Sequence, residues 1–543
     1  MWGGFFLLIF LLIIVIIVLL LPPAVIMFIL WSQSRKTPHS IIRSHPYLGW
    51  LRYFLEKIGP EFRQYWFDND TSAEPFSRND FLCVTFAAKY RTDLISFGGK
   101  RDYDLPGYYL ANSLFTRLAE EMSVDNRETI ASKKYTIHKE GLFSRKENFI
   151  DDESTKWLLS DEDALVVGKE RIQPWVLKGL FGVSATSYGA VGEHYILSTG
   201  QAVQMAGGSW MNTGEGGVAP EHLQTGADLV AQIGPGLFGY RDEKGDFSYE
   251  EFRKVAAHVQ VKAFELKFAQ GAKIRGGHLE GSKVSAKVAA IRKVPEGITV
   301  NSPNRFPFLN NAERTLKFVA DLQKAGGKPV GIKIVVGAKE SLIDFFVTMK
   351  RLAIYPDFLT VDGGEGGSGA TFKSMADSMG LPLYAALIAA TDAAVETGVR
   401  DRFAVFASGK LISPDKVAIA LALGADATVS ARGFMIANGC IMALQCHTGR
   451  CPAGVTTTDP KYQEALLVEE KKWRVANYLL HVRSSVFALS AACGLTSPRQ
   501  LTRAHVVYKN EYGRTVRASE LFPVQAFGQD MNTFGIDTIN PTA

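Results

Sequence analysis

Three of the five cysteines of this chain lie on one short segment, CIMALQCHTGRC (residues 440–451). Five residues separate Cys440 from Cys446, and four separate Cys446 from Cys451. This spacing fits neither the CxxC pairs of structural zinc sites nor a thioredoxin motif, and His447 is the only neighbour that could complete a zinc site. Three soft thiolates on one loop match iron–sulfur ligation, and three ligands suit a cluster of three irons.

Glycine-rich and small-residue segments form a second group with chemical potential. The segment DGGEGGSGA (362–370) has five glycines in nine positions after an apolar run, so its backbone could cradle an anion or lie flat against a ring system. A surface turn is the alternative interpretation. The segments ASGK (407–410) and ARG (431–433) precede helical patterns, as phosphate-binding loops of barrels do, although ordinary helix capping would also explain them.

Three cations, Lys273, Arg292 and Lys333, lie at or near the ends of predicted strands or in the segments that follow. If they face a common pocket, they could hold a dicarboxylate or stabilise negative charge on a reduced ring. Solvated surface cations are the more common case.

The elements that would position these residues begin near residue 170. Short apolar runs there end in glycine, small or polar residues and alternate with helical patterns, which is typical of βαβ units in a parallel sheet. Eight such runs over about 260 residues predict an α/β fold, a (β/α)8 TIM-type barrel, with the loops after the strands on its catalytic face. The predicted strands lie within residues 181–189, 209–217, 264–273, 298–304, 331–337, 358–367, 403–410 and 427–433.

The first 31 residues contain no charged side chain and exceed the roughly 20 apolar residues that cross a bilayer. They lack the basic start of a signal peptide, so we expect an uncleaved, single-pass transmembrane helix. Pro22 and Pro23 leave open one kinked span or a span followed by an interfacial segment. Arg35, Lys36 and Arg43 come just after it, which predicts that the catalytic domain lies in the cytoplasm. In that reducing compartment the cysteines are expected to be catalytic or metal-binding.

Composition and the change of pattern along the chain set the predicted domains. With 47% hydrophobic and 21% charged residues, the chain is typical of a globular protein, and its net charge of +5 is too small and too dispersed to indicate nucleic-acid binding. We predict a transmembrane anchor (1–31), a linker with an irregular N-terminal cap region (32–165), the barrel with the iron–sulfur loop (166–460) and a C-terminal helical extension (461–543).

Six segments resemble the FMN-binding synthase domain of glutamate synthase and occur in the order of that family. They are SYGA (187–190), NTGEGG (212–217), KFAQGAK (267–273), GGHLEGSKV (276–284), DGGEGGSGA (362–370) and GCIMALQCHTGRCPAGV (439–455). The chain is similar in particular to the shorter, membrane-anchored members of the family that lack the glutaminase domain.

This resemblance implies a barrel that carries FMN beside a 3Fe–4S cluster and reduces 2-iminoglutarate, formed from 2-oxoglutarate and ammonia, to L-glutamate. The cluster ligands would be Cys440, Cys446 and Cys451. The 2-oxoglutarate site would contain Glu215, Gln270, Lys273 and Arg292. The residues implied to bind FMN are Ser187, Lys333, Asp362, Gly363, Gly364, Ser408, Gly409, Ala431, Arg432 and Gly433.

The glutaminase domain and the C-terminal β-helix of full-length glutamate synthases have no expected counterpart here, so ammonia would come from solution or from a separate subunit. No GxGxxG follows a predicted strand, so we expect electrons from a partner subunit or a ferredoxin. Two alternatives remain. One is a flavin-dependent amine or amino-acid dehydrogenase that passes electrons to a membrane acceptor, and the other is a noncatalytic flavin redox sensor.

Overall fold

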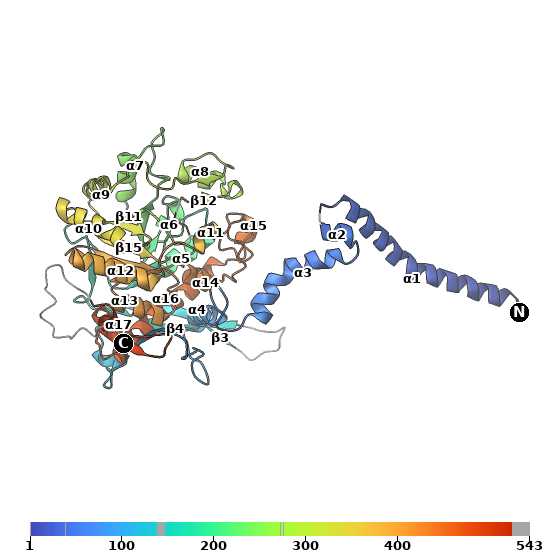
Figure 1. The fold of residues 1–543 in the computed structure, drawn as a ribbon, viewed down its shortest axis with the longest axis horizontal. Helices are drawn as coiled ribbons and strands as arrows, with labels where there is room; N and C mark the ends of the chain where they lie inside the picture. Colours follow the sequence, from blue (N-terminus) through green and yellow to red (C-terminus); the bar gives the residue numbers. More distant parts are fainter. Residues whose placement is uncertain (1, 39, 138–146, 272, 275, 524–543) are drawn as a thin grey trace, which may run out of the picture. The chain divides into compact units, whose positions relative to one another are not determined.

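The computed structural model describes residues 2–38, 40–137, 147–271, 273–274 and 276–523. Its contacts divide the chain into two compact units, Met1–Asn79 and Asp80–Ala543. The last twenty residues of the predicted C-terminal extension, 524–543, lie outside the described residues. The first unit contains three α-helices and a π-helical turn, which are α1 (Trp2–Lys36), α2 (Ser40–Ser44), α3 (Gly49–Phe62) and η1 (Arg63–Phe67) (Figure 1).

Helix α1 continues without interruption through Pro22 and Pro23. At these two positions the sequence had left open whether the helix would continue or end. Its residues Ile9–Lys36 are long and apolar enough to cross a membrane, and the large apolar side chains of this stretch are not buried within the protein. No other helix of the described chain meets this criterion of length and composition. Arg35 and Lys36 occupy its last turn, where positive charge interacts favourably with the helix dipole.

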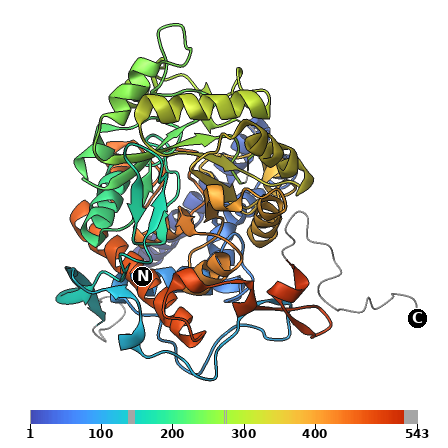
Figure 2. The same cartoon turned by 90° about the vertical axis from the view of Figure 1, so that its left-hand side faces the viewer.

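The second unit contains a closed barrel of eight parallel strands, with helices around its outside (Figures 1 and 2). The predicted (β/α)8 TIM-type barrel is therefore confirmed. In chain order the barrel strands are β8 (Phe181–Val183), β9 (Trp210–Asn212), β10 (Asp228–Ile233), β11 (Val261–Lys267), β14 (Val330–Ile334), β15 (Phe358–Asp362), β16 (Ala404–Ser408) and β17 (Ala427–Ser430).

One of the eight predicted strands was wrong. Within 298–304 the structure has only β13 (Val300–Asn301), which pairs antiparallel with β12 (His278–Leu279) outside the barrel. The third barrel strand is instead β10, which pairs in parallel with β9 and β11. Its apolar run is interrupted by Gln232, whose amide donates a hydrogen bond to Glu265 inside the barrel. Because this partner is distant in the sequence, hydrophobic pattern alone did not identify the strand.

The helices between the strands have regular start and stop signals. In α9, Asn311 is the N-cap and accepts a hydrogen bond from the Arg314 amide at 2.9 Å, and Gly327 ends the helix with a φ of 64°. The helices of this layer are α5 (Glu193–Ala206), α6 (Pro220–Gln224), α7 (Tyr249–Ala256), α8 (Ala286–Arg292), α9 (Ala312–Gly326), α10 (Glu340–Leu352), α11 (Lys373–Ala376), α12 (Leu383–Glu396), α13 (Pro414–Ala422) and α14 (Arg432–Ala437).

A hairpin of β6 (Leu165–Val167) and β7 (Trp175–Leu177) closes the N-terminal end of the barrel. Trp175 lies edge-on to Trp210, with ring centroids 5.2 Å apart, and also contacts Phe406. The Gln173 amide donates to the Gly327 carbonyl, and Arg171 pairs with Asp357 at 2.9 Å. Because these partners precede β14 and β15, the hairpin covers the end of the barrel opposite the strand carboxyl ends.

The remaining described elements of the second unit lie outside the barrel. Strand β1 pairs with β18, so segments near the two ends of the unit lie side by side, as both ribbon views show. Long helix α16 packs against α5. The elements are α4 (Arg78–Tyr90), β1 (Gly107–Leu110), β2 (Val124–Asp125), β3 (Thr129–Ile137), β4 (Glu147–Thr155), β5 (Leu158–Leu159), α15 (Pro460–Gln463), α16 (Val468–Ala492), β18 (Val506–Lys509), β19 (Thr515–Arg517) and α17 (Ala518–Leu521).

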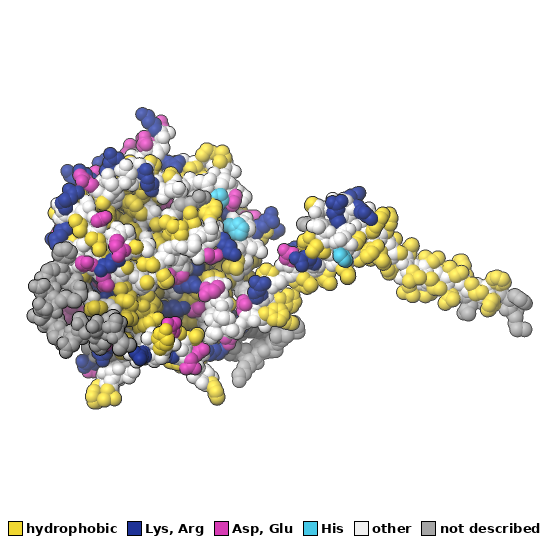
Figure 3. Space-filling model, in the orientation of Figure 1, with side chains coloured by type: hydrophobic (Ala, Val, Ile, Leu, Met, Phe, Trp, Pro, Cys, Tyr) yellow, Lys and Arg dark blue, Asp and Glu magenta, His cyan; other side chains and the backbone are white. Residues whose placement is uncertain are grey.

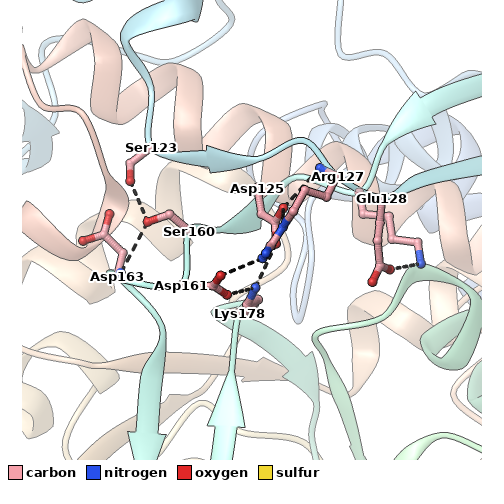
Figure 4. Close-up of polar contacts among 9 residues, drawn as sticks. Ser123, Asp125, Arg127, Glu128, Ser160, Asp161, Asp163 and Lys178 are labelled. Carbon is pink, nitrogen blue, oxygen red and sulfur yellow. Dashed lines mark hydrogen bonds and ion pairs between the residues drawn. The ribbon is translucent and has the colours of Figure 1, made fainter.

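Ion pairs connect the strands of the cap to the start of the barrel (Figure 4). Asp125 of β2 accepts hydrogen bonds from Arg127 and, at 2.8 Å, from Lys178, which also pairs with Asp161. Lys178 lies just before β8, at the closed end of the barrel. The charges of this network are paired with one another and lie away from the strand carboxyl ends, so its role is structural.

Candidate active site at the open end of the barrel

The predicted site residues lie at or after the carboxyl ends of the barrel strands, so the fold brings most of them to one face. Asp362 and Ser408 are the last residues of β15 and β16, and Lys333 is the second-last residue of β14. The others lie in the connections that follow strands. These are Ser187 after β8, Glu215 after β9, Gln270, Lys273 and Arg292 after β11, Gly363 and Gly364 after β15, Gly409 after β16, and Ala431, Arg432 and Gly433 after β17.

Four charged side chains form a cluster at this face. Lys267, the last residue of β11, pairs with Glu215 at 2.7 Å. Lys273 and Arg292 are 7% and 4% exposed, and the charges of both act on Glu215. The cluster therefore has three cations and one carboxylate, an excess of two positive charges that is largely shielded from water.

Burial and neighbouring charges shift the pKa values within this cluster. Burial, together with the charge of Lys267, lowers the pKa of Lys273 to about 8. Burial lowers the pKa of Arg292 to about 10. Burial would raise the pKa of Glu215, but the attraction of Lys267, Lys273 and Arg292 outweighs it and brings the value to about 2. Glu215 is thus ionised at neutral pH, whereas Lys273 can exchange a proton near neutrality.

Hydrogen bonds hold Arg292 and Lys273 in place, but not every N–H donor of Arg292 has an acceptor. The Arg292 Nη2 donates to the Tyr188 carbonyl at 3.1 Å and to Ser187 Oγ at 3.4 Å, but its buried Nε has no partner. The Lys273 Nζ donates to the Ala370 carbonyl at 3.1 Å. Gln270 donates to the Gly367 carbonyl at 2.7 Å, so the loops after β11 and β15 are joined beside the cluster.

Lys267 was not among the predicted site residues, although a signal for it exists. Glu265 and Lys267 are two positions apart on β11, so their side chains leave the same side of the strand. Ser302 was also missed, and its hydroxyl donates to Glu215 Oε2 at 3.3 Å. Ser302 belongs to the segment that the sequence assigned to a barrel strand, so its place near the site depends on the antiparallel pairing of β12 and β13.

A second buried charge pair lies at the ends of β14 and β15. Lys333 Nζ is 3.2 Å from Asp362 Oδ2, and both residues are about 3% exposed. Asp362 also accepts a hydrogen bond from the Gly271 amide at 2.9 Å. A Cβ atom at Gly271 would lie 2.1 Å from the Gly363 carbonyl oxygen, so glycine permits the close approach of these two loops.

Small and polar residues line the neighbouring strand ends of β8, β16 and β17. Ser408 and Ser184 hydroxyls are 3.4 Å apart, and Gly409 has a φ of 146°, which disfavours any side chain there. The Gly433 amide donates to Ser430 Oγ at 3.3 Å at the start of α14. Arg432 donates to the Glu365 carbonyl at 2.6 Å, so the ends of β15 and β17 are connected.

A layer of hydrogen-bonded polar side chains lies inside the barrel and supports the site. The buried carboxylate of Glu265 accepts hydrogen bonds from Asn212 at 2.8 Å, Gln232 at 2.6 Å and Thr360 at 2.6 Å. Glu265, Asn212, Thr360 and Lys333 line a small cavity, which the aromatic rings of Trp210, Phe358 and Phe406 also line. The layer fixes strands β9, β10, β11 and β15 relative to one another.

The cysteine segment forms a loop after α14. All five cysteines are free thiols, with Cys440 and Cys446 partly exposed and Cys451 buried. Burial raises the pKa of Cys440 to about 12, and the neighbouring Cys446 and Cys451 add to that shift, so the three thiols influence one another. Within the described residues, no three His, Cys, Asp or Glu side chains are grouped as metal ligands.

Lys283, another residue that the sequence did not single out, ties this loop to the chain segment that carries Arg292 of the charged cluster. It is 3% exposed, and its Nζ donates to the carbonyls of Ala190, Cys446 and Thr456 at 3.0–3.1 Å. Lys283 and Arg292 lie on one excursion of the chain between β11 and β14. The same excursion therefore contacts the cysteine loop at one end and the charged cluster at the other.

Comparisons with known proteins agree with this architecture. Residues 117–496 match the family model described as the conserved region in glutamate synthase. The glutamate synthase large subunit-like protein YerD of Bacillus subtilis is 47% identical over 488 residues, which cover 90% of this chain and 93% of that protein. The archaeal glutamate synthase [NADPH] of Methanocaldococcus jannaschii is 33% identical over 323 residues, 59% of this chain and 60% of that protein.

The family match covers more than half of the chain, and the identity to YerD extends over nearly all of it. The matched region contains the whole barrel, the charged cluster and the cysteine loop. This chain belongs to the glutamate synthase family and is a glutamate synthase-like oxidoreductase.

Proposed function

We propose that this chain is a membrane-anchored FMN and iron–sulfur enzyme that reduces 2-iminoglutarate, formed from 2-oxoglutarate and ammonia, to L-glutamate. The observation that carries the proposal is the charge of the buried cluster at the open end of the barrel. Among the residues that the structure describes, Lys267, Lys273 and Arg292 face one carboxylate, Glu215, which leaves two positive charges uncompensated. Buried charges require partners, and 2-oxoglutarate supplies two carboxylates.

The residues beside the cluster fit a flavin mononucleotide. Gly271, Gly363 and Gly409 keep the strand ends free of side chains, and a Cβ atom at Gly271 would overlap the opposite loop. Lys333 supplies a buried cation for the ring, with Asp362 at 3.2 Å. The residues that we propose to hold FMN are those implied by the family resemblance, which are Ser187, Lys333, Asp362, Gly363, Gly364, Ser408, Gly409, Ala431, Arg432 and Gly433.

The chemistry of the donors also fits an iron–sulfur cluster. Cys440, Cys446 and Cys451 are three unpaired thiols on one loop, and thiolates are the ligands that iron–sulfur clusters use. We propose that they hold a 3Fe–4S cluster. When bound, the cluster supplies single electrons and FMN supplies a hydride.

The residues of the chain would bind and orient the substrate. Lys273 and Arg292 would each hold a carboxylate, with Arg suited to two parallel hydrogen bonds through its free Nε and one Nη. Glu215, which is ionised, would stabilise the positive charge of the protonated imine nitrogen, and Gln270 would position the neighbouring loop. Lys273 Nζ, with a pKa of about 8, can hold or release a proton near neutral pH. Fixing both carboxylates orients the imine carbon, and such positioning can lower a barrier by several kcal/mol.

The decisive experiment separates cofactor binding from substrate binding. Lys273→Ala is expected to retain FMN but to lose 2-oxoglutarate- and ammonia-dependent reoxidation of the reduced flavin, followed by its absorbance under anaerobic conditions. Lys254→Ala, at an exposed lysine of α7, is the matched control and should behave as the wild type. Unchanged turnover in Lys273→Ala would remove Lys273 from the site and contradict the proposal.

Cofactor content gives a separate test of the iron–sulfur assignment. Purified protein should release FMN and contain iron and acid-labile sulfide. Cys440→Ser, Cys446→Ser and Cys451→Ser should each lower iron and sulfide, whereas Cys83→Ser and Cys493→Ser should not. Equal iron content in all five variants would exclude the loop as the ligand source.

Helix α1 supports membrane anchoring, with the catalytic unit in the cytoplasm because Arg35, Lys36 and Arg43 follow the span. We further propose a separate electron donor, either a partner subunit or a ferredoxin, and ammonia as the nitrogen source.

The same helix favours a second candidate function. A flavin-dependent amine or amino-acid dehydrogenase that passes electrons to a membrane quinone would also benefit from an anchor in the bilayer. Anaerobic bleaching of the flavin by L-glutamate, followed by reoxidation with a water-soluble quinone, would favour this direction. Reoxidation only by 2-oxoglutarate with ammonia would favour synthesis.

A further inference from the structure

The segment after the apolar span has an unusually hydrophobic surface. Residues 40–67 form α2, α3 and η1, and large apolar side chains along α3 and η1 are exposed. Trp50, Leu51, Phe54, Leu55, Phe62 and Trp66 are between 37% and 75% exposed. Soluble proteins rarely leave so many large side chains in water, so this surface requires an explanation.

These side chains share one face of α3. Positions 50, 51, 54, 55, 58 and 62 recur at spacings of three and four residues, the period of one helix face. Arg52 and Glu56 lie on the opposite face, Lys57 lies at the border of the apolar stripe of α3, and Glu61 is the one charged residue within that stripe. The helix is therefore clearly amphipathic over its full length, and Tyr65 and Trp66 of η1 extend the stripe.

Helix α3 begins close to the end of the span. The residue range between the end of α1 at Lys36 and the start of α3 at Gly49 contains α2. The Gly49 amide donates to the His45 carbonyl at 2.8 Å, and a Cβ atom at Gly49 would lie 2.8 Å from the Ile41 carbonyl oxygen. Because α3 starts in contact with α2, a span formed by α1 would hold the start of α3 near the membrane surface.

The composition of the segment matches a lipid headgroup region better than a protein core. Between residues 40 and 67, four basic residues stand against two acidic ones, and Arg35 and Lys36 precede them. Figure 3 shows Lys and Arg side chains gathered around α2, beside the hydrophobic surface of α1. Basic residues near a bilayer are attracted to anionic lipids, and Trp and Tyr prefer the membrane–water interface.

We propose that α3, with its extension to Trp66, is an interfacial helix that lies in the headgroup region of an anionic membrane, with its apolar face toward the acyl chains. This inference rests on the membrane anchoring in the proposed function, and it adds a second membrane contact to the span. Such helices insert about 5–10 Å into the boundary between headgroups and acyl chains. The contact would restrict the height and tilt at which the chain leaves the bilayer.

The test uses the full chain in phospholipid nanodiscs that contain phosphatidylcholine with or without phosphatidylglycerol. The photoreactive residue p-benzoylphenylalanine replaces Phe54 on the apolar face or, as the matched control, Glu56 on the polar face. A third variant carries it at Phe10 in α1 and reports on the span itself. After irradiation, covalent adducts are identified by mass spectrometry.

The expected result is a lipid adduct at position 54 and several-fold less at position 56, with a higher yield in the anionic nanodiscs. Arg43→Ser and Arg52→Ser should each lower the hydrogen-exchange protection of residues 47–66 in anionic nanodiscs by about fivefold.

A protein adduct at position 54, from a second copy or from the same chain, would overturn the inference, as would equal lipid adducts at 54 and 56. A lipid adduct at Phe10 without one at 54 would reject the interfacial helix but keep the anchor, and no lipid adduct at Phe10 would reject the anchor as well.

Discussion

At the scale of single residues, the charge imbalance of the Glu215, Lys267, Lys273 and Arg292 cluster has direct consequences for binding. The cations are buried, so their charges are poorly screened, and burial together with the charge of Lys267 lowers the pKa of Lys273. A dianionic ligand would supply the missing negative charge. Two predictions follow from this balance, one for pH dependence and one for stability.

The affinity for 2-oxoglutarate is expected to fall as the pH rises above about 8. Lys273 has a pKa of about 8 in the free protein, so it is charged below that pH and neutral above it. A bound dianion favours the charged form of Lys273 and so raises the pKa of Lys273 in the complex. Between the pKa of Lys273 in the free protein and its pKa in the complex, the affinity should fall by up to about tenfold per pH unit. Calorimetric titration without ammonia between pH 6.5 and 9.5 measures this.

Lys273→Arg is the matched control for that titration. The guanidinium stays charged across the whole range, so the pH dependence above about 8 should disappear even if the affinity changes. A wild-type affinity that stays constant to pH 9.5 would show that Lys273 does not hold a carboxylate.

Glu215→Gln should destabilise the protein, because it leaves Lys267 without its 2.7 Å partner among other buried cations. Breaking a buried pair of this kind costs about 3–5 kcal/mol of unfolding free energy. Chemical denaturation measures the loss, and Glu243→Gln, at an exposed carboxylate, should be nearly neutral. Saturating 2-oxoglutarate should restore more stability to Glu215→Gln than to the wild type; no difference would argue against an anion site.

At the scale of elements, the β6–β7 hairpin is expected to stabilise the barrel without taking part in the chemistry. Trp175 is 2% exposed and packs on Trp210 and Phe406 at the closed end. Trp175→Ala should therefore cost about 3–5 kcal/mol, while the FMN content of the folded fraction stays unchanged. Val176→Ala, at the neighbouring residue that is 53% exposed, should change stability by less than about 0.5 kcal/mol in the same denaturation experiment. Similar losses in both variants would show that the hairpin does not plug the barrel.

The sequence predicted the barrel strands well where glycine follows the apolar run, as it does after Asp362 and after Ser408. It failed at β10, because Gln232 is polar but is satisfied by Glu265 across the barrel interior. It also assigned 298–304 to the barrel, although Val300 and Asn301 pair with β12. Both errors concern pairings between residues that are distant in the chain, which local periodicity does not encode.

At the scale of the whole molecule, the proposed anchor predicts how the full chain fractionates. It should sediment with membranes, resist an alkaline carbonate wash and be released by detergent. A double change, Val15→Arg with Leu19→Arg, places two charges in the span at a cost of about 2.5–3.5 kcal/mol each, so it should move the protein into the soluble fraction. Wild-type protein released by carbonate alone would exclude a transmembrane span.

The sequence by itself determined the barrel class, the family motifs and the residue types that gather at strand ends, because glycine placement, apolar runs and cysteine spacing are local properties. It also determined that residues 1–31 lack charge. Only the tertiary structure decided that Lys267 and Ser302 meet Glu215 and that Lys283 supports the cysteine loop. It also decided that the site has two excess positive charges, since buried charge depends on the distances and the solvent exclusion that folding creates between remote segments.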